Sequence, residues 1–187
     1  MANKDAAFGL RPIGKVGQNR DAQGLSEYDI AASASAIYFN DPVEILSTGT
    51  IGVAAATDAL LGSLTGVFLT DATTSKPTFA NHLNASNTAT DIVGFVSDDP
   101  YQRFEIQSDG ATEATDVGQN ADIVYAAGSS PDFVSKVELD ESDHKDATAQ
   151  LRIIGISKDP EHNTAGSANV NLGVIINEHQ LKGTTGV

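Results

Sequence analysis

The stretch "IVGFVSDDPYQRFEIQSDG", residues Ile92 to Gly110, indicates the fold of this chain. Two short apolar runs flank an Asp-Asp-Pro corner, and "RIIGISKDP", residues Arg152 to Pro160, again joins an apolar run, a glycine, a serine and an Asp-Pro corner. Proline fixes φ and the aspartate side chain bonds the turn backbone. Gly94 and Gly155 lie inside the apolar runs, where glycine marks a bulge or a close backbone approach. We interpret both stretches as strands that bend at the same kind of corner.

Similar short runs, rich in β-forming residues and closed by Gly, Asn, Asp or Pro, recur along the whole chain. Strands are predicted at Glu27–Ile30, Val43–Leu46, Thr50–Ala55, Gly66–Thr70, Ile92–Val96, Arg103–Gln107, Ala121–Tyr125, Lys136–Leu139, Leu151–Ser157 and Asn171–Asn177. Single helical turns are expected only at residues 112–119 and 140–147. Many short strands with turn residues between them predict an all-β fold, a single β-barrel or a jelly-roll-like sandwich with an extended N-terminal arm.

The apolar positions of these runs give the predicted core. It consists of Val43, Ile45, Val67, Leu69, Ile92, Val93, Phe95, Phe104, Ile106, Ile123, Val124, Ile153, Ile154, Ile156, Val174 and Ile176. A chain of 187 residues is long enough to bury such a core in one domain. It has no cysteine, so disulfides and thiolate metal sites are excluded.

Charge divides the chain into two parts. Residues 1–20 hold four basic residues and one carboxylate, a net charge of +3, while residues 21–187 hold seven basic and 24 acidic residues, a net charge of −17. We therefore expect an extended basic N-terminal arm (1–20) and a β-rich body (21–187). An acidic body repels phosphate backbones, so nucleic acid is not an expected partner. No apolar run has the length of a signal peptide or a membrane helix, so no membrane partner is expected.

No catalytic motif accompanies this pattern. The four histidines, His82, His144, His162 and His179, do not form an HExxH pair, and neither a GxSxG elbow nor a phosphate-binding glycine loop occurs. The acidic run Asp140–Asp146 lacks the glycine and the terminal glutamate of a calcium loop and is predicted to be a solvated turn, with cation binding left open. No catalytic, cofactor-binding or metal-binding residue is predicted, and no enzyme or cofactor is expected.

Five segments, in order along the chain, resemble head decoration (cement) proteins of tailed bacteriophages. They are "MANKDAAFGLRPIGKVG" (1–17), "EYDIAASASAIYFNDPVEILSTGTI" (27–51), "GFVSDDPYQRFEIQSDG" (94–110), "TDVGQNADIVY" (115–125) and "NLGVIINEHQL" (171–181). The Ala/Ser-rich Ala31–Ala36 and the Ser/Thr/Asn-rich Thr70–Asp91 depart from the family pattern. The resemblance implies a virion structural protein that binds the outer surface of the capsid, with the major capsid protein as its partner. It also implies a location on the capsid exterior after synthesis in the bacterial host cytoplasm. Because icosahedral shells offer threefold positions, where three arms would bind at once, we expect a homotrimer.

The N-terminal arm supplies the candidate partner-binding residues. Phe8, Leu10 and Ile13 are apolar anchors, Arg11 and Lys15 offer charge to an acidic partner, and Pro12 stiffens the chain. Such an arm would contact a neighbouring subunit or the shell protein, with Phe8 as its main anchor. The alternative for the same segment is an edge strand or a leader of its own domain.

Other functions remain open at this stage. A tail- or fibre-associated phage protein would share the β-rich, acidic composition. A carbohydrate-active β-sandwich enzyme would require two facing carboxylates in a deep cleft, which sequence alone does not reveal.

Overall fold

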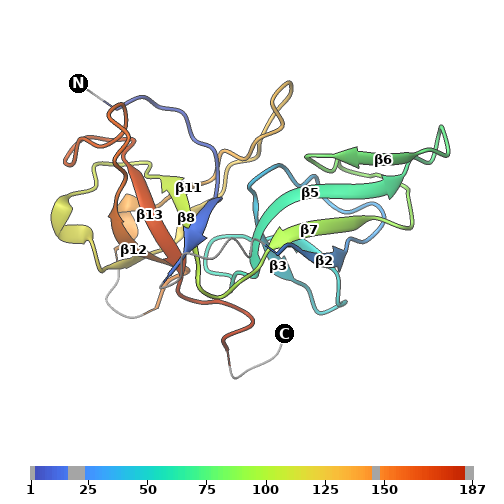
Figure 1. Cartoon of the computed structure of the whole chain (residues 1–187), viewed down its shortest axis with the longest axis horizontal. Helices are drawn as coiled ribbons and strands as arrows, with labels where there is room; N and C mark the ends of the chain where they lie inside the picture. The colour runs from blue at the N-terminus through green and yellow to red at the C-terminus, as the bar shows by residue number, and fades with distance from the viewer. Residues whose placement is uncertain (1–2, 17–23, 145–147, 184–187) are drawn as a thin grey trace.

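A computed structural model describes residues 3–16, 24–144 and 148–183 of the chain. Its regular structure is almost entirely β, as predicted, and the antiparallel sheets pack as a sandwich, with no closed barrel among the described strands (Figure 1). Two single turns of 3-10 helix, η1 (Ala114–Asp116) and η2 (Glu141–Asp143), fall within the two ranges predicted for helical turns. Residues 145–147 of the second range lie outside the described residues. Within the described part of the chain, no helix has the length and apolar character needed to cross a membrane.

The described strands form two large sheets and one small ribbon. The sheet that we call the β8 sheet has the order β1-β8-β13-β12-β9, the β5 sheet has the order β2-β7-β5-β3-β4 with β6 beside β5, and β10 pairs with β11. The strands are β1 (Arg11–Lys15), β2 (Ser26–Asp29), β3 (Pro42–Ile45), β4 (Ile51–Val53), β5 (Gly62–Thr70), β6 (Pro77–Ala80), β7 (Val93–Ser97), β8 (Gln102–Gln107), β9 (Asn120–Ala121), β10 (Ile123–Val124), β11 (Glu138–Leu139), β12 (Leu151–Ile156) and β13 (Asn171–Ile176). In Figure 1 the β8 sheet occupies the left half and the β5 sheet the right half.

The Asp-Asp-Pro corner lies where the chain passes from the β5 sheet to the β8 sheet, between β7 and β8. The carbonyl oxygen of Asp99 accepts a hydrogen bond from the N–H three residues later at 2.8 Å, and its carboxylate accepts from the N–H two residues later at 2.8 Å. Asp159 makes the same two bonds at 3.0 and 3.1 Å. The prediction that both stretches bend at the same kind of corner is therefore confirmed.

The two glycines of these stretches have different roles. The pairing of β12 with β13 shifts register between Ile153 and Gly155, which is a bulge. Gly94 instead allows a close approach, because a Cβ there would lie 2.9 Å from the Cδ1 of Ile51 and 3.0 Å from that of Ile30. Both roles are those predicted for a glycine inside a strand.

Each large sheet covers its own hydrophobic cluster. The cluster of the β8 sheet includes Phe104, Leu151 and Leu172, and that of the β5 sheet includes Val43, Leu64 and Val67. Ten residues of the predicted core are buried: Val43, Val67, Leu69, Ile92, Phe104, Ile106, Ile123, Ile153, Val174 and Ile176. Five are only partly buried, namely Ile45, Val93, Phe95, Ile154 and Ile156.

Val124 is a correction to the predicted core, since it is exposed. The run predicted at Ala121–Tyr125 is split at Asp122 into β9, which pairs with β12, and β10, which pairs with β11. The Asp122 carboxylate accepts the Gln150 N–H at 2.9 Å between these two pairings. The inward and outward alternation assumed for one continuous strand therefore does not hold here.

Candidate partner-binding surface

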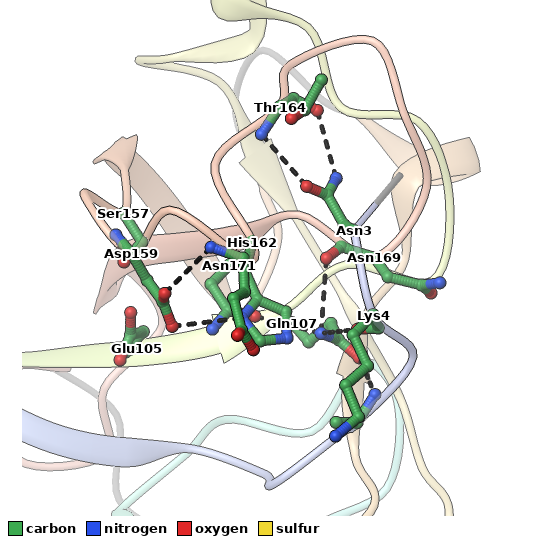
Figure 2. A network of polar contacts seen from close by, with 12 residues as sticks. Asn3, Lys4, Glu105, Gln107, Ser157, Asp159, His162, Thr164, Asn169 and Asn171 are labelled. Carbon is green, nitrogen blue, oxygen red and sulfur yellow. Dashed lines mark hydrogen bonds and ion pairs between the residues drawn. The ribbon is translucent and has the colours of Figure 1, made fainter. Parts of the chain in front are cut away.

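The N-terminal segment, residues 3–16, lies along the β8 sheet of its own chain. Asn3 is buried, its side-chain amide donates to the carbonyl oxygens of Thr164 and Ala168, and its Oδ1 accepts the Thr164 N–H (Figure 2). Farther along, the N–H of Ala6 donates to the side-chain oxygen of Gln107 at 2.8 Å. The same Gln107 amide donates to the carbonyl oxygens of Lys4 and Asn169 (Figure 2). These buried polar contacts fix the start of the segment to the body.

A glycine lets the segment turn into the sandwich. Gly9 has φ +74°, and a Cβ there would lie 2.4 Å from the Cβ of Ser135 and 2.5 Å from the carbonyl oxygen of Asn40. Both facts require glycine, because other residues rarely adopt this backbone conformation and any side chain would clash. The next residue, Leu10, donates its N–H to the Asn40 carbonyl at 2.9 Å, and its side chain is fully buried in the cluster of the β8 sheet.

Leu10 therefore corrects one predicted partner contact, because a side chain inside its own core cannot anchor a second chain. After Leu10, β1 pairs antiparallel with β8 and forms the edge of the β8 sheet. The alternative interpretation of the arm as an edge strand thus describes residues 11–15. The predicted boundary between arm and body, after residue 20, lies outside the described residues.

The other five predicted residues lie at or beside the free edge of this sheet. Ile13 is 47% exposed at a shift in register between Pro12 and Gly14. The Arg11 side chain is half exposed, forms an ion pair with Glu105 on β8, and places its guanidinium carbon 4.3 Å from the centre of the Phe8 ring. Pro12 and Phe8 are partly buried.

Lys15 contacts the Asp-Asp-Pro corner. Its ammonium group forms an ion pair with the Asp99 carboxylate, and this hydrogen bond is the largest of the interactions that hold the pKa of Asp99 below its usual value. The charges of Arg11 and Lys15 are thus partly neutralised by their own chain. Only part of this charge is left for another molecule.

Exposed apolar side chains continue the edge beyond β1. The N–H of Val16 donates to the Tyr101 carbonyl at 2.9 Å, and the Tyr101 ring, 62% exposed, lies 4.5 Å from the ammonium nitrogen of Lys182. Val16 and Leu181 are also about half exposed. We call Arg11, Ile13, Val16, Tyr101 and Leu181 the β1-edge surface. Its last two members were not predicted, although "DPY" and the closing "HQL" lie within the segments that carry the family resemblance.

A second exposed apolar region lies on the outer face of the β5 sheet. Phe79 on β6 is 71% exposed and packs against Phe68 and Phe95. Neither β6 nor this face was predicted, because "PTFA" is short, begins with proline and lies in the Ser/Thr/Asn-rich stretch.

Three of the histidines lie in separate environments in the described part of the chain. His162 Nδ1 lies 3.1 Å from Asp159 within the corner turn, and His144 Nδ1 lies 3.8 Å from Asp116. His179 is buried, and burial lowers its pKa. Among the described residues, no group of three or more His, Asp or Glu side chains is placed to hold a metal ion.

One carboxylate is buried without a basic partner in the described chain. Asp41, at the start of β3, is inaccessible to solvent, and its Oδ2 accepts the Tyr38 N–H at 2.7 Å. Burial raises the pKa of Asp41 to about 6. Its neighbour Asn40 donates to the Phe8 carbonyl at 3.1 Å, so this buried charge lies where the N-terminal segment meets the body.

Comparison with known proteins gives no relative: no family model, no curated protein and no solved structure matches the chain.

Proposed function

We propose that this chain is a non-enzymatic virion structural protein that binds the outer surface of a phage capsid and stabilises it. The observation that carries the proposal is the ordered set of five segments that resemble head decoration proteins. These segments contribute all or most of β1 to β3, β7 to β10 and β13, which are strands of both sheets. The resemblance thus extends through the framework of the fold and is not confined to one loop.

The geometry of the described residues agrees with a binding role. The sandwich exposes apolar side chains on its β1-edge surface, where Ile13, Val16 and Tyr101 lie in water in the free chain. Exposed apolar groups next to basic Arg11 and Lys182 suit a protein partner that offers apolar and acidic groups. We therefore propose that the β1-edge surface contacts the major capsid protein.

Three copies around a threefold position of the shell would engage it together. Closed cyclic symmetry is the usual arrangement of homo-oligomers, and three weak contacts formed at once bind far more tightly than one. A homotrimer on the capsid exterior is accordingly part of the proposal.

Purified capsids of the same phage that lack this protein provide the test. The wild-type protein is expected to bind them to saturation, and Ile13→Asp is expected to weaken binding at least tenfold. Leu46→Asp adds the same charge to an exposed leucine outside the β1-edge surface and is the matched control, expected to bind as the wild type does. Failure of the wild-type protein to bind such capsids would contradict the proposal.

Location in the virion separates this proposal from its alternative. A tail- or fibre-associated protein would be found only at the tail of intact particles. Antibody labelling of purified virions distinguishes the two, because a decoration protein covers the whole head.

A further inference from the structure

The outer face of the β5 sheet holds an aromatic cluster whose central ring is exposed. The Phe79 ring on β6 is centred 5.4 Å from the ring of Phe68 on β5 and 5.3 Å from that of Phe95 on β7, and it lies within 17° of parallel to the latter. Phe79 nevertheless remains 71% exposed. A large apolar side chain that stays in water but is held by two neighbours is already arranged to anchor an interface.

A shallow groove runs beside this ring. Its lining includes Phe79 and Phe95 together with Leu25, Thr65 and Gly66. None of the lining residues carries a charge, although the chain has 25 acidic and 11 basic residues. Gly66 has no side chain to fill the groove. The protruding Phe79 ring and the groove therefore lie side by side. A twofold contact between identical chains needs a patch that is complementary to itself, because each copy supplies the same patch. A protruding ring beside a groove meets this need.

The charges around the groove select a second copy in one orientation. Glu27 and Asp29 on β2 pair with Phe95 and Val93, so both carboxylates stand on the same face as the aromatic cluster, along its β2 side. On the opposite side, β6 has no charged residue and is preceded by Lys76.

A twofold axis parallel to the strands places the β2 side of one copy over the β6 side of the other. The carboxylates of each copy then face β6, which has no charged residue. The turn before β6 holds both Lys76 and Asp71, and the Asp71 N–H donates to the Lys76 carbonyl at 3.0 Å. An axis perpendicular to the strands would place the two β2 sides together, and four carboxylates would repel one another.

The β6 edge of this sheet is poorly suited to pairing with a strand of another chain, so a contact between chains is more readily made through the face of the sheet. β6 is four residues long and begins with Pro77, which has no N–H to donate to an added strand. Association by simple strand addition along β6 is therefore disfavoured.

We propose that two copies of this chain associate through the outer face of the β5 sheet, with Phe79 of each copy seated in the groove beside Leu25 and Phe95 of the other. The contact is a property of the free protein and does not depend on capsid binding. It is weak in dilute solution, because one anchor per copy is small beside a standard interface. It becomes populated at about millimolar concentrations, which proteins held side by side on a surface reach.

Analytical ultracentrifugation of the full chain, from dilute solution to about 1 mM, tests the proposal. The wild-type protein is expected to dimerise reversibly, and Phe79→Ser to weaken dimerisation at least tenfold. Because Phe79 is largely exposed, the variant is expected to fold, and circular dichroism checks this. Tyr101→Ser removes another exposed aromatic ring outside this face and is expected to dimerise as the wild type does.

Charge reversal tests the orientation. Lys76→Glu is expected to weaken dimerisation more than Lys158→Glu, which makes the same change in net charge on the loop after β12. A wild-type protein that stays monomeric at about 1 mM, or a Phe79→Ser variant that associates as the wild type does, would overturn the proposal. Equal effects of the two lysine variants would overturn the orientation. None of these outcomes bears on whether the β1-edge surface binds capsids.

Discussion

Asp41 differs from most acidic residues of this chain because its carboxylate is buried. It is inaccessible to solvent and has a pKa of about 6, against an ordinary value of 3.8. The folded protein therefore holds a proton on this group at pH values where the unfolded chain has released it. The Asp41 contribution to stability is greatest below about pH 4 and is lost as the pH rises through about 6.

Asp41→Asn tests this reasoning. The amide oxygen can still accept the Tyr38 N–H, and no buried charge remains. The stability advantage of the variant over the wild type is therefore expected to grow from pH 4.5 to pH 8. A shift of about two pKa units corresponds to a gain on the order of 3 kcal/mol. Urea denaturation at both pH values measures it. Asp29→Asn, at an exposed carboxylate, is the control for the change in net charge, and an Asp41→Asn profile parallel to the wild-type profile would contradict the expectation.

Two large apolar residues of the predicted core, Phe104 and Ile154, differ in how deeply they are buried. Phe104 is fully buried in the cluster of the β8 sheet, whereas Ile154 is only partly buried beside the bulge in β12. Phe104→Ala is expected to cost ~3–5 kcal/mol of unfolding free energy, because it leaves a cavity. Ile154→Ala is expected to cost clearly less. Equal losses in urea denaturation would show that the two positions are buried alike.

At the scale of elements, most strands follow from local pattern. All ten predicted runs overlap observed strands. Each strand of an antiparallel sheet alternates core-facing and solvent-facing residues, so each run carries its own signal in the sequence. β1 was predicted only as the alternative interpretation of the arm, and β6 was missed. Both "RPIGK" and "PTFA" contain proline and little alternation and are strands only because a neighbouring edge is available to pair with them. Pairing partners are set by tertiary structure, and the pattern of a short run does not contain them.

The candidate site was predicted in part for the same reason. Composition drew attention to residues 8–15, but it could not show that Leu10 enters the core or that β1 pairs with β8. Tyr101 joins the β1-edge surface through contacts with Val16 and Lys182, which lie far from it in the chain, and Leu181 is the neighbour of Lys182. Such contacts leave no periodic signal in the sequence.

The integration of β1 changes what truncation does. Removing residues 2–13 takes Leu10 out of the core and uncovers much of the edge of β8, so the truncated protein is expected to lose stability, in contrast to a chain that loses a loose leader. Burial of Leu10 alone predicts a loss of ~2–5 kcal/mol, as for Leu10→Ala. Thermal or urea denaturation of the full chain, Leu10→Ala and the truncated form checks this. A truncated protein as stable as the full chain would show that the segment does not support the body.

At the scale of the whole molecule, a net charge of −14 governs association. Copies of the chain repel one another. Salt weakens this repulsion, because at 0.1 M the interaction between exposed charges is largely screened beyond about 10 Å. Contacts between copies are therefore expected to strengthen as salt is added. Binding of the β1-edge surface to an acidic partner is expected to weaken under the same conditions if Arg11 and Lys182 contribute. Titrations at low and high salt measure both trends.

The central proposal, a decoration protein on the capsid exterior, is tested most directly by a cryo-EM reconstruction of purified virions. We expect β-sandwich density over the outer surface of the shell, in threes around threefold positions, with the β1-edge surface toward the major capsid protein. Density for this chain only at the tail, or a bare shell in particles that contain it, would contradict the proposal.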